Sequence, residues 1–292
     1  MRVTVRIPAT SANLGPGFDC FGLALDLCNE VTVDTEGPAG VRWEGEGADE
    51  LPTDGSDLIG RVMAAVAGRM ALPIAPQDRL ALNRIPLASG LGSSSAATVA
   101  GVVLASVLLD LGIHEDPTSV FAIASEIEGH PDNAAAATFG GFTIALPDGG
   151  VRRLEPHPGL RPVVLVPDAR TSTAQARRGL PDPIPRADAV ANIAHAALAV
   201  EALTRDPALL SSALVDRLHE EVRLAAVPDV AGVAAELRRA HIPVCVSGSG
   251  PSLLAFERDD RPTIDPDRLG LPSSWGILRP GVRTTGYEVT AG

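Results

Sequence analysis

The sequence predicts an α+β protein with two layered domains. Segments that alternate apolar and polar residues, as strands do, are interspersed with segments of helical spacing along all 292 residues. The sequence EPHPG at residues 155–159 interrupts this pattern and is the candidate domain boundary. We therefore expect a first domain over residues 1–155 and a second over residues 156–292, and the last strands can return to the first domain.

The first half carries clear strand and helix signals. Val3, Val5 and Ile7 alternate with polar residues and predict a strand that ends at Pro8. Helical spacing of apolar residues predicts a helix over residues 56–70. Further strands are expected over residues 31–33, 41–43 and 80–85, and a hairpin over residues 142–146 and 151–154.

Residues 96–113 form an apolar stretch that is long enough to cross a bilayer. The stretch is rich in alanine, contains Ser106 and Asp110, and follows a glycine loop directly. We interpret it as a helix buried in the core of the first domain. A second helix is predicted over residues 117–128, with Gly129 and Pro131 as its stop signal.

The second half predicts a further mixture of elements. Strands are expected over residues 163–166, 244–246 and 253–256, and helices over residues 187–205, 208–224 and 229–240. Asp216, His219 and Arg223 stand at positions i, i+3 and i+7, so a continuous helix would place them on one face. A polar stripe of this kind is more often a solvated face than a site.

The charged residues exclude several classes of protein. All 24 basic residues are arginine, so mechanisms that need a lysine amine are excluded, including those of P-loop kinases, protein kinases and Schiff-base enzymes. The net charge of −12, without a basic run, argues against nucleic-acid or membrane partners. Cys20, Cys28 and Cys245 form no CxxC pair, which favours a reducing, cytoplasmic location.

The strongest candidate site is the sequence PLASGLGSSSAA at residues 86–97, between a predicted strand and a predicted helix. Gly90 and Gly92 allow the backbone to turn tightly and approach a ligand. Three serines follow at the start of the helix, where unpaired N–H groups and the helix dipole favour an anion. A glycine-rich turn with a serine cap is the alternative interpretation.

Two further loops carry related signals. The sequence VSGSGPS at residues 246–252 lies between two short apolar strands, and PATSANLGPGFD at residues 8–19 combines glycines with Asn13 and Asp19. Taken alone, the first also fits a glycine hairpin and the second a surface turn.

In this order, the three segments resemble the signature motifs of the GHMP kinases. Five short segments are similar to those of the homoserine kinase branch. They are ATSANLGPGFDCFG at 9–22, EGHPDN at 128–133, FGGF at 139–142, TAQAR at 173–177 and DRLHEEVR at 216–223. The absence of lysine agrees, because mevalonate-kinase-like members pair a lysine with a catalytic aspartate.

The resemblance implies a GHMP kinase fold, with an N-terminal nucleotide-binding domain like domain 2 of ribosomal protein S5 and a ferredoxin-like C-terminal domain. It implies ATP-dependent phosphorylation of the side-chain hydroxyl of L-homoserine to O-phospho-L-homoserine, in threonine biosynthesis, with Mg²⁺. A GHMP kinase with another acceptor, such as an isoprenoid precursor or shikimate, and a non-catalytic GHMP-fold regulator are the alternatives. The resemblance leaves the oligomeric state open, and a homodimer is one possible state.

The resemblance also implies roles for individual residues. ATP would be bound by Pro86, Leu87, Ala88, Ser89, Gly90, Leu91, Gly92, Ser93, Ser94, Ser95 and Ala96, with Asp57 near the base or ribose where the family carries asparagine. Ser94 and Glu128 would be the Mg²⁺ ligands and catalytic residues. Glu126 is the rival, but two residues turn a helix by more than half a circle, so both cannot face one ion.

The amino-acid substrate would be held by charged groups of opposite sign. Asp19 is assigned to its ammonium, and Arg177 and Arg223 to its carboxylate. Asn13, His130, Asn133, Thr173 and Gly248 would complete the substrate site, and the other histidines are interpreted as structural or surface residues. Asn133 stands where relatives with a catalytic base carry aspartate, so we expect phosphoryl transfer without a dedicated base.

Overall fold

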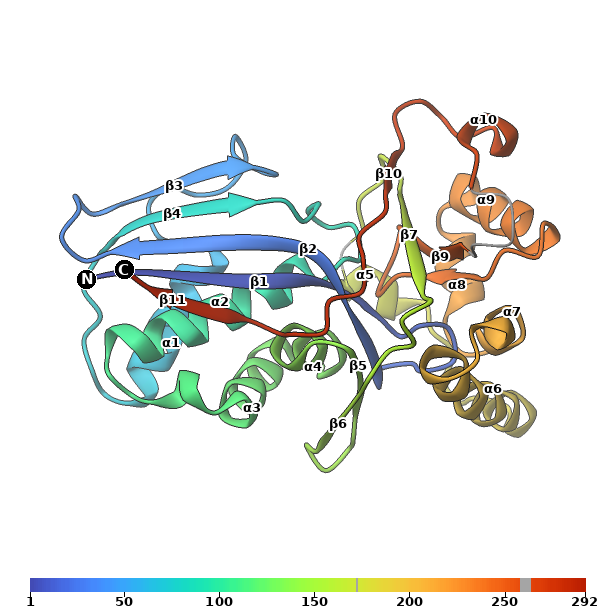
Figure 1. Ribbon diagram of the computed structural model, residues 1–292, viewed down its shortest axis with the longest axis horizontal. Helices are drawn as coiled ribbons and strands as arrows, with labels where there is room; N and C mark the ends of the chain where they lie inside the picture. The colour runs from blue at the N-terminus through green and yellow to red at the C-terminus, as the bar shows by residue number, and fades with distance from the viewer. Residues whose placement is uncertain (172, 258–263) are drawn as a thin grey trace.

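The computed structural model describes residues 1–171, 173–257 and 264–292, and these form two β-sheets with associated helices. The larger sheet has seven strands, in the order β11-β1-β2-β4-β3, with β5 paired to β2 and β6 paired to β5. The smaller sheet has four strands, in the order β10-β7-β9-β8. Figure 1 shows the two sheets beside each other along the long axis, with both termini at the far end of the larger sheet. The predicted α+β class is confirmed.

The strands are β1 (Arg2–Ala12), β2 (Phe21–Asp34), β3 (Gly40–Gly45), β4 (Asp78–Asn83), β5 (Phe142–Ala145), β6 (Val151–Leu154), β7 (Arg161–Val166), β8 (Val244–Val246), β9 (Leu253–Glu257), β10 (Gly276–Leu278) and β11 (Glu288–Ala291). The α-helices are α1 (Leu58–Arg69), α2 (Ser93–Leu108), α3 (Pro117–Glu128), α4 (Asp132–Phe139), α5 (Thr173–Arg178), α6 (Arg186–Thr204), α7 (Leu210–Ala213), α8 (Glu220–Ala225), α9 (Pro228–Arg239) and α10 (Pro266–Leu269).

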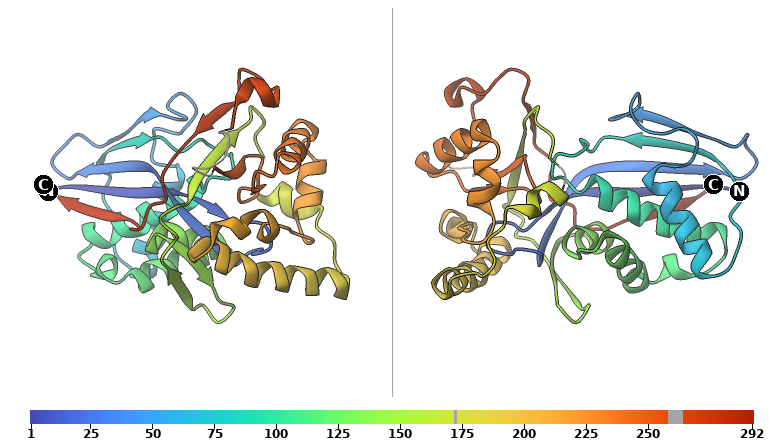
Figure 2. Two further views of the ribbon diagram at one scale, coloured as in Figure 1. Left: turned by 45° about the vertical axis from the view of Figure 1, so that its right-hand side comes forward. Right: turned by 180° about the vertical axis from the view of Figure 1, so that it is seen from behind.

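Strands β1 and β2 form a long antiparallel hairpin, whose connecting loop, residues 13–20, extends from the larger sheet to the helices of the second half (Figure 2). The prediction that the first strand ends at Pro8 is wrong, because β1 continues to Ala12. The pairing register shifts between Pro8 and Ala9. Such an irregularity accommodates a residue that has no N–H to donate, so the strand resumes beyond the proline.

Helices α1 to α4 cover one face of the larger sheet (Figure 1). Helix α2 lies in the middle of this layer, and its residues from Ser95 to Ser106 are buried, apart from the half-buried Ala97. No helix in the described ranges is long and apolar enough to cross a membrane. The interpretation of residues 96–113 as a buried helix is therefore confirmed, although the helix ends at Leu108. No sequence pattern predicts helix α4, because Gly129 and Pro131 signal only the end of α3.

The predicted helix over residues 208–224 is wrong. The chain forms the short helix α7, leaves the helical conformation at Leu214, and starts again as α8 at Glu220. The Asp216 carboxylate accepts the backbone N–H groups of Leu218, His219 and Glu220 at 2.7–3.0 Å. This local capping competes with the helical hydrogen bonds and interrupts the helix. Asp216 and His219 thus precede α8 instead of sharing a helical face with Arg223.

Helix α1 begins at a buried ion pair. Asp57 is its N-cap and accepts the Gly60 N–H at 3.2 Å, and its other oxygen forms an ion pair with Arg79 of β4. The two side chains are only 1% and 5% exposed. The guanidinium of Arg79 also lies over the Trp43 ring, 5.9 Å from its centroid.

Replacing Arg79 with leucine is expected to lower the free energy of unfolding by about 3–5 kcal/mol, because it leaves the Asp57 carboxylate buried without its cation. Urea denaturation at pH 7 measures the change. Arg42→Leu is the matched control, because Arg42 pairs with Asp78 while its side chain is 65% exposed. We expect a much smaller loss there. Equal losses of unfolding free energy in the two variants would show that the buried Asp57–Arg79 pair contributes no more to stability than the exposed pair.

Candidate active site

The three loops singled out in the sequence contact one another. The Gly248 N–H donates to the Ala12 carbonyl at 3.0 Å, and the Ser252 N–H donates to the Ser89 carbonyl at 3.1 Å. The Ser247 hydroxyl lies 2.8 Å from the Gly90 carbonyl oxygen. Segments separated by up to about 240 residues thus form one loop cluster between the two sheets.

The loop between β1 and β2 is held in an unusual conformation. Asn13 and Asp19 have φ values of 67° and 57°, in the left-handed region that most residues with a side chain avoid. The Asn13 side chain stabilises the loop from both ends of its amide. Its Oδ1 accepts the Asp19 N–H at 3.0 Å, and its Nδ2 donates to the Gly248 carbonyl at 2.8 Å. Non-glycine residues in such conformations cluster at functional sites.

The N-terminus of α2 is open. Gly92 is the N-cap, with φ 67°, and it makes no side-chain capping hydrogen bond. Among the described residues no side chain accepts the first N–H groups of the helix, and the helix dipole adds positive potential at this point. Ser93 and Ser94 line the adjacent cavity, whereas Ser95 is fully buried. This arrangement is suited to an anion such as phosphate.

A cavity of about 350 Å³ lies at the loop cluster. The predicted site residues that line it are Asn13, Asp19, Asp57, Leu87, Ala88, Ser89, Gly90, Gly92, Ser93, Ser94, Ala96, His130, Asn133, Arg177, Arg223 and Gly248. Pro86, Leu91, Ser95 and Glu128 do not line it. Leu91 belongs to the hydrophobic core, at 1% exposure, so its predicted contact with ATP is not supported by its position. Thr173 lies in α5, and its side chain is outside the described part of the structure.

Glu128, the last residue of α3, faces the start of α2. Its Oε2 accepts hydrogen bonds from the hydroxyls of Ser94 at 3.2 Å and Ser95 at 2.7 Å, and its Oε1 accepts the Thr98 hydroxyl at 2.6 Å. The side chain is 7% exposed. No arginine among the described residues pairs with this carboxylate, and His130 Nε2 lies 4.0 Å from it.

Glu126, the rival of Glu128, lies elsewhere. Its side chain is 68% exposed and forms an ion pair of 2.9 Å with Arg69 of α1. The two glutamates therefore point to different surroundings, as expected for residues two apart on a helix. Of the two, only Glu128 contacts the serines at the start of α2.

Charged groups of both signs line the cavity beside Asn13. Arg177 of α5 forms a bidentate ion pair with Asp19, at 2.7 and 2.9 Å. These hydrogen bonds raise the pKa of the Arg177 guanidinium. Arg223 of α8 is 7% exposed, and burial lowers its pKa. The guanidiniums of both arginines lie over the Phe18 ring, 5.8 and 5.6 Å from its centroid.

A second polar group links α4 to β1. The Thr10 hydroxyl donates to Asn133 Oδ1 at 2.7 Å, which fixes the orientation of the Asn133 amide. Asp132 Oδ1 accepts the Asn133 N–H at 2.7 Å and lies 3.4 Å from His130 Nδ1. The contact with Asp132 raises the pKa of His130, against the opposing effect of burial.

Sequence reasoning missed several residues that line the cavity, notably Trp43, Leu51, Asp132, Thr171 and Ser249. Asp132 and Ser249 lie inside two of the segments that carry the family resemblance. Their position in these segments could therefore have predicted that they belong to the site. Trp43 and Leu51 bear no motif. Trp43 reaches the cavity because β3 pairs with β4, which is a long-range contact, and Leu51 follows in the loop after β3.

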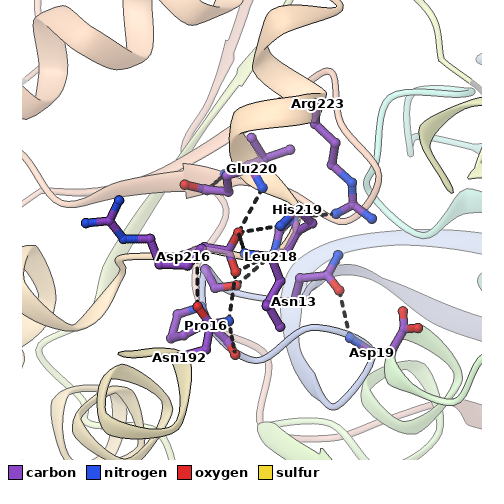
Figure 3. A network of polar contacts seen from close by, with 12 residues as sticks. Asn13, Pro16, Asp19, Asn192, Asp216, Leu218, His219, Glu220 and Arg223 are labelled. Atoms are coloured by element: carbon purple, nitrogen blue, oxygen red, sulfur yellow. Dashed lines mark hydrogen bonds and ion pairs between the residues drawn. The ribbon is translucent and has the colours of Figure 1, made fainter. Parts of the chain in front are cut away.

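His219, interpreted as structural from the sequence, lies in a buried polar network (Figure 3). Its Nε2 is 2.8 Å from the Gly15 carbonyl oxygen, and its Nδ1 is 2.9 Å from Arg223 Nη1. Asn192 of α6 joins this network by donating to Asp216 Oδ1 at 2.9 Å. Burial, together with the nearby Arg223 charge, lowers the pKa of His219 to about 4.

This low pKa predicts a loss of stability in mild acid. Between pH 6.5 and 4 the unfolded chain binds a proton at His219 that the folded chain does not, so stability falls as the pH falls. The shift from 6.5 to about 4 corresponds to a free-energy difference of about 3 kcal/mol. Urea denaturation of the wild-type chain and of His219→Gln across this range should show the smaller loss in the variant. Parallel curves would contradict the assignment.

The comparisons with known proteins agree with this geometry. The GHMP kinases N terminal domain family model matches residues 59–141. A homoserine kinase of Clavibacter michiganensis is 45% identical over 263 residues, which cover 88% of this chain and 83% of that protein. A homoserine kinase of Streptomyces coelicolor is 41% identical over 292 residues, with 98% of this chain and 94% of the relative covered.

A solved structure supports the same relationship. The crystal structure of a homoserine kinase from Cytophaga hutchinsonii has a TM-score of 0.79 to this chain at 26% identity, and the match covers 99% of this chain and 97% of the other. The sequence identities hold over nearly the whole chain, and the fold follows the same course from end to end. The chain therefore belongs to the homoserine kinase family of the GHMP kinases.

Proposed function

We propose that the protein transfers the γ-phosphoryl group of ATP to the side-chain hydroxyl of L-homoserine, which yields O-phospho-L-homoserine for threonine biosynthesis. The observation that carries this proposal is the juxtaposition of two unlike features in one cavity. An open helix N-terminus suits phosphates, and beside it lie a carboxylate and two guanidiniums that suit an α-amino acid.

The phosphates of ATP are assigned to the loop from Pro86 to Ala96 and the first turn of α2. Leu87 to Gly90, Gly92 and Ser94 border the cavity, and the first N–H groups of α2 have no side-chain acceptor among the described residues. Trp43 and Leu58 supply apolar lining near Asp57, which suits the flat face of a purine. The charge of the Asp57 carboxylate is already neutralised by its ion pair with Arg79. We therefore assign Asp57 a place beside the base or ribose.

The residues at the start of α2 fit a magnesium ion. Glu128 offers a buried carboxylate without an arginine partner among the described residues, and Ser94 adds a hydroxyl 3.2 Å from it. No group of three or more acidic, histidine or cysteine side chains suited to a metal occurs in the described ranges. This fits Mg²⁺, which keeps water and substrate phosphates in its shell and needs only one or two carboxylates. When bound, the ion would neutralise charge on the phosphates.

The amino-acid substrate is assigned to Asp19, Arg177 and Arg223. In the structure Asp19 and Arg177 bind each other, so their charges are already paired. Homoserine carries an ammonium and a carboxylate, and it can insert between them by replacing one ion pair with two. This exchange offsets part of the cost of separating Asp19 from Arg177, and it favours a zwitterion over an acceptor with a single charge.

Transfer itself is proposed to proceed without an enzymic base. The amide of Asn133 cannot take a proton, and its oxygen is occupied by the Thr10 hydroxyl. Phosphoryl transfer depends mainly on alignment and on stabilisation of developing charge. Asn133, with the N-terminus of α2, would orient the acceptor hydroxyl and the transferred group.

Replacing Asp19 with asparagine is expected to raise the KM for homoserine by about 10- to 100-fold, because the hydrogen bond to the substrate ammonium loses its negatively charged acceptor, while kcat changes by less than about 3-fold. Steady-state kinetics with saturating ATP measures both values. Asp26→Asn, a change at another partly exposed carboxylate of the β1–β2 hairpin, serves as control, because Asp26 pairs with Arg283 and does not line the cavity. A loss confined to kcat at position 19 would instead identify Asp19 as the base.

The proposed function is tested by ADP release from MgATP with L-homoserine, D-homoserine, L-threonine, L-serine, mevalonate and shikimate. Turnover confined to L-homoserine supports the proposal. Turnover only with mevalonate or shikimate would keep the phosphate site and overturn the assignment of Asp19, Arg177 and Arg223. Nucleotide binding without turnover of any acceptor would identify a non-catalytic member of the fold.

A further inference from the structure

The guanidinium of Arg223 is held through one of its three nitrogens. Nη1 donates to His219 Nδ1 at 2.9 Å and to the Gly248 carbonyl at 2.6 Å. Nε is buried and has no hydrogen-bond partner among the described residues, and Arg223 lines the cavity. Because Nε is enclosed by protein atoms, it does not itself reach the cavity. The contacts to Nη1 leave Nη2, which makes no hydrogen bond to a described residue, as the nitrogen that can donate to a carboxylate in the cavity.

The chemistry of its two partners fixes the tautomer of His219. Arginine cannot accept a hydrogen bond, so Nδ1 of His219 must be the unprotonated acceptor. The Gly15 carbonyl cannot donate, so Nε2, at 2.8 Å, must carry the proton. The side chain of His219 is 0% exposed, and the Phe18 ring stacks on it with centroids 5.2 Å apart. The imidazole therefore has one orientation, and it presents a lone pair to Arg223.

The same imidazole connects the two halves of the amino-acid site. Gly15 belongs to the loop that ends at Asp19, and Gly248 accepts from both Arg223 and Asn13. Asn13 in turn accepts the Asp19 N–H. Starting at Gly15, the hydrogen bonds run through His219, Arg223, Gly248 and Asn13 back to the same loop. This closed path, part of which Figure 3 shows, sets the position of Arg223 relative to Asp19.

We propose that His219 is a positioning residue for substrate recognition, which aims Nη2 of Arg223 at the carboxylate of an α-amino acid and fixes the distance from the Arg223 guanidinium to Asp19. The inference rests on the proposed function, because it takes the acceptor to be an α-amino acid. His219 touches no reacting atom, and its effect is transmitted through Arg223. Loss of the imidazole should therefore weaken binding of the amino acid and leave ATP binding unchanged.

The test compares His219→Leu and His219→Gln, each in the wild-type and the Arg223→Ala background, by steady-state kinetics in the full chain. A glutamine amide can accept from Arg223 and donate to Gly15, whereas leucine does neither. We expect His219→Leu to raise the KM for L-homoserine by about 10- to 100-fold, with kcat and the KM for ATP within about 3-fold. Glutamine should restore most of the loss. In the Arg223→Ala background the leucine change should add less than about 3-fold, since the interaction is already absent.

The control is His195→Gln, because His195 contacts the Ser212 carbonyl outside the cavity. The proposal would be overturned if His219→Leu and Arg223→Ala raised the KM for L-homoserine independently, so that their fold-changes multiplied in the double variant. An equal rise in the KM for ATP would also overturn it, and either result would indicate a general structural role. Nitrogen NMR of the substrate-free protein gives an independent readout, with Nδ1 of His219 expected unprotonated and shifted in Arg223→Ala. If no amino acid is phosphorylated, the proposed function fails, while the NMR result still decides whether His219 holds Arg223.

Discussion

Replacing Glu128 with glutamine should lower kcat by about 100- to 1000-fold, a loss typical of removing one electrostatic group that stabilises the transition state. The substitution keeps the shape of the side chain and removes its negative charge. Glu128 is buried against the hydroxyls of Ser94, Ser95 and Thr98, so solvent cannot replace that charge. Initial rates at saturating ATP and homoserine measure the loss. The Mg²⁺ concentration for half-maximal rate should rise in the same variant.

Glu126→Gln provides the matched control, because it makes the same chemical change two residues earlier in α3. Glu126 is exposed and pairs with Arg69, away from the start of α2. We expect its kcat and its Mg²⁺ requirement to equal those of the wild-type protein. A larger effect at position 126 than at position 128 would overturn the assignment of Glu128. Circular dichroism and a denaturant curve for each variant would separate catalytic loss from unfolding.

Replacing Gly92 with alanine should reduce kcat/KM for ATP by about 100-fold or more, because a displacement of about 1 Å at a catalytic site can have this effect. Gly92 has φ 67°, and a Cβ built on it overlaps the Thr10 hydroxyl and lies 3.1 Å from Asn133 Oδ1. Thr10 must then turn away and release Asn133, or the loop must shift away from the phosphates. Both outcomes disturb the start of α2.

Gly112→Ala separates the effect of this overlap from the effect of backbone conformation. Gly112 has φ 68°, nearly the value at Gly92, and a Cβ built there meets nothing within 4 Å. Both variants carry the strain of a left-handed alanine, about 1–2 kcal/mol. Only Gly92→Ala should lose activity with ATP. Similar kinetic losses in the two variants would show that strain alone explains the effect at Gly92.

The molecule brings its two candidate subsites together through the β1–β2 hairpin. The hairpin begins in the larger sheet, and its loop contacts residues of the second half through Gly15 and Asn13. The phosphate loop touches the same loop cluster through Gly90 and Ser247. A displacement of the second half of the chain relative to the larger sheet would therefore change the geometry of both subsites. The alignment of the two subsites thus depends on how the two halves pack together.

The sequence by itself determined the fold class, the family resemblance and the three loops. Each of these signals depends on neighbouring residues, such as Gly90 and Gly92 before three serines, or the apolar run of α2. Glycine conformations and apolar periodicity are encoded within a few positions, so they can be read without knowing what lies opposite. Local helix geometry also showed that Glu126 and Glu128 cannot face one ion, and the preference for Glu128 came from its place in the EGHPDN segment that carries the resemblance.

The tertiary structure alone decided how these parts bind one another. The pairing of Asp19 with Arg177 joins residues 158 positions apart, and that of Asp57 with Arg79 joins different elements. The break before α8 depends on Asp216, whose carboxylate is held in place by Asn192 of α6. His219 became a candidate positioning residue only when Gly15 and Arg223 were found on either side of its ring. Ion pairs and side-chain hydrogen bonds act over about 3 Å, so they are set by the packing of distant elements, which no local pattern records.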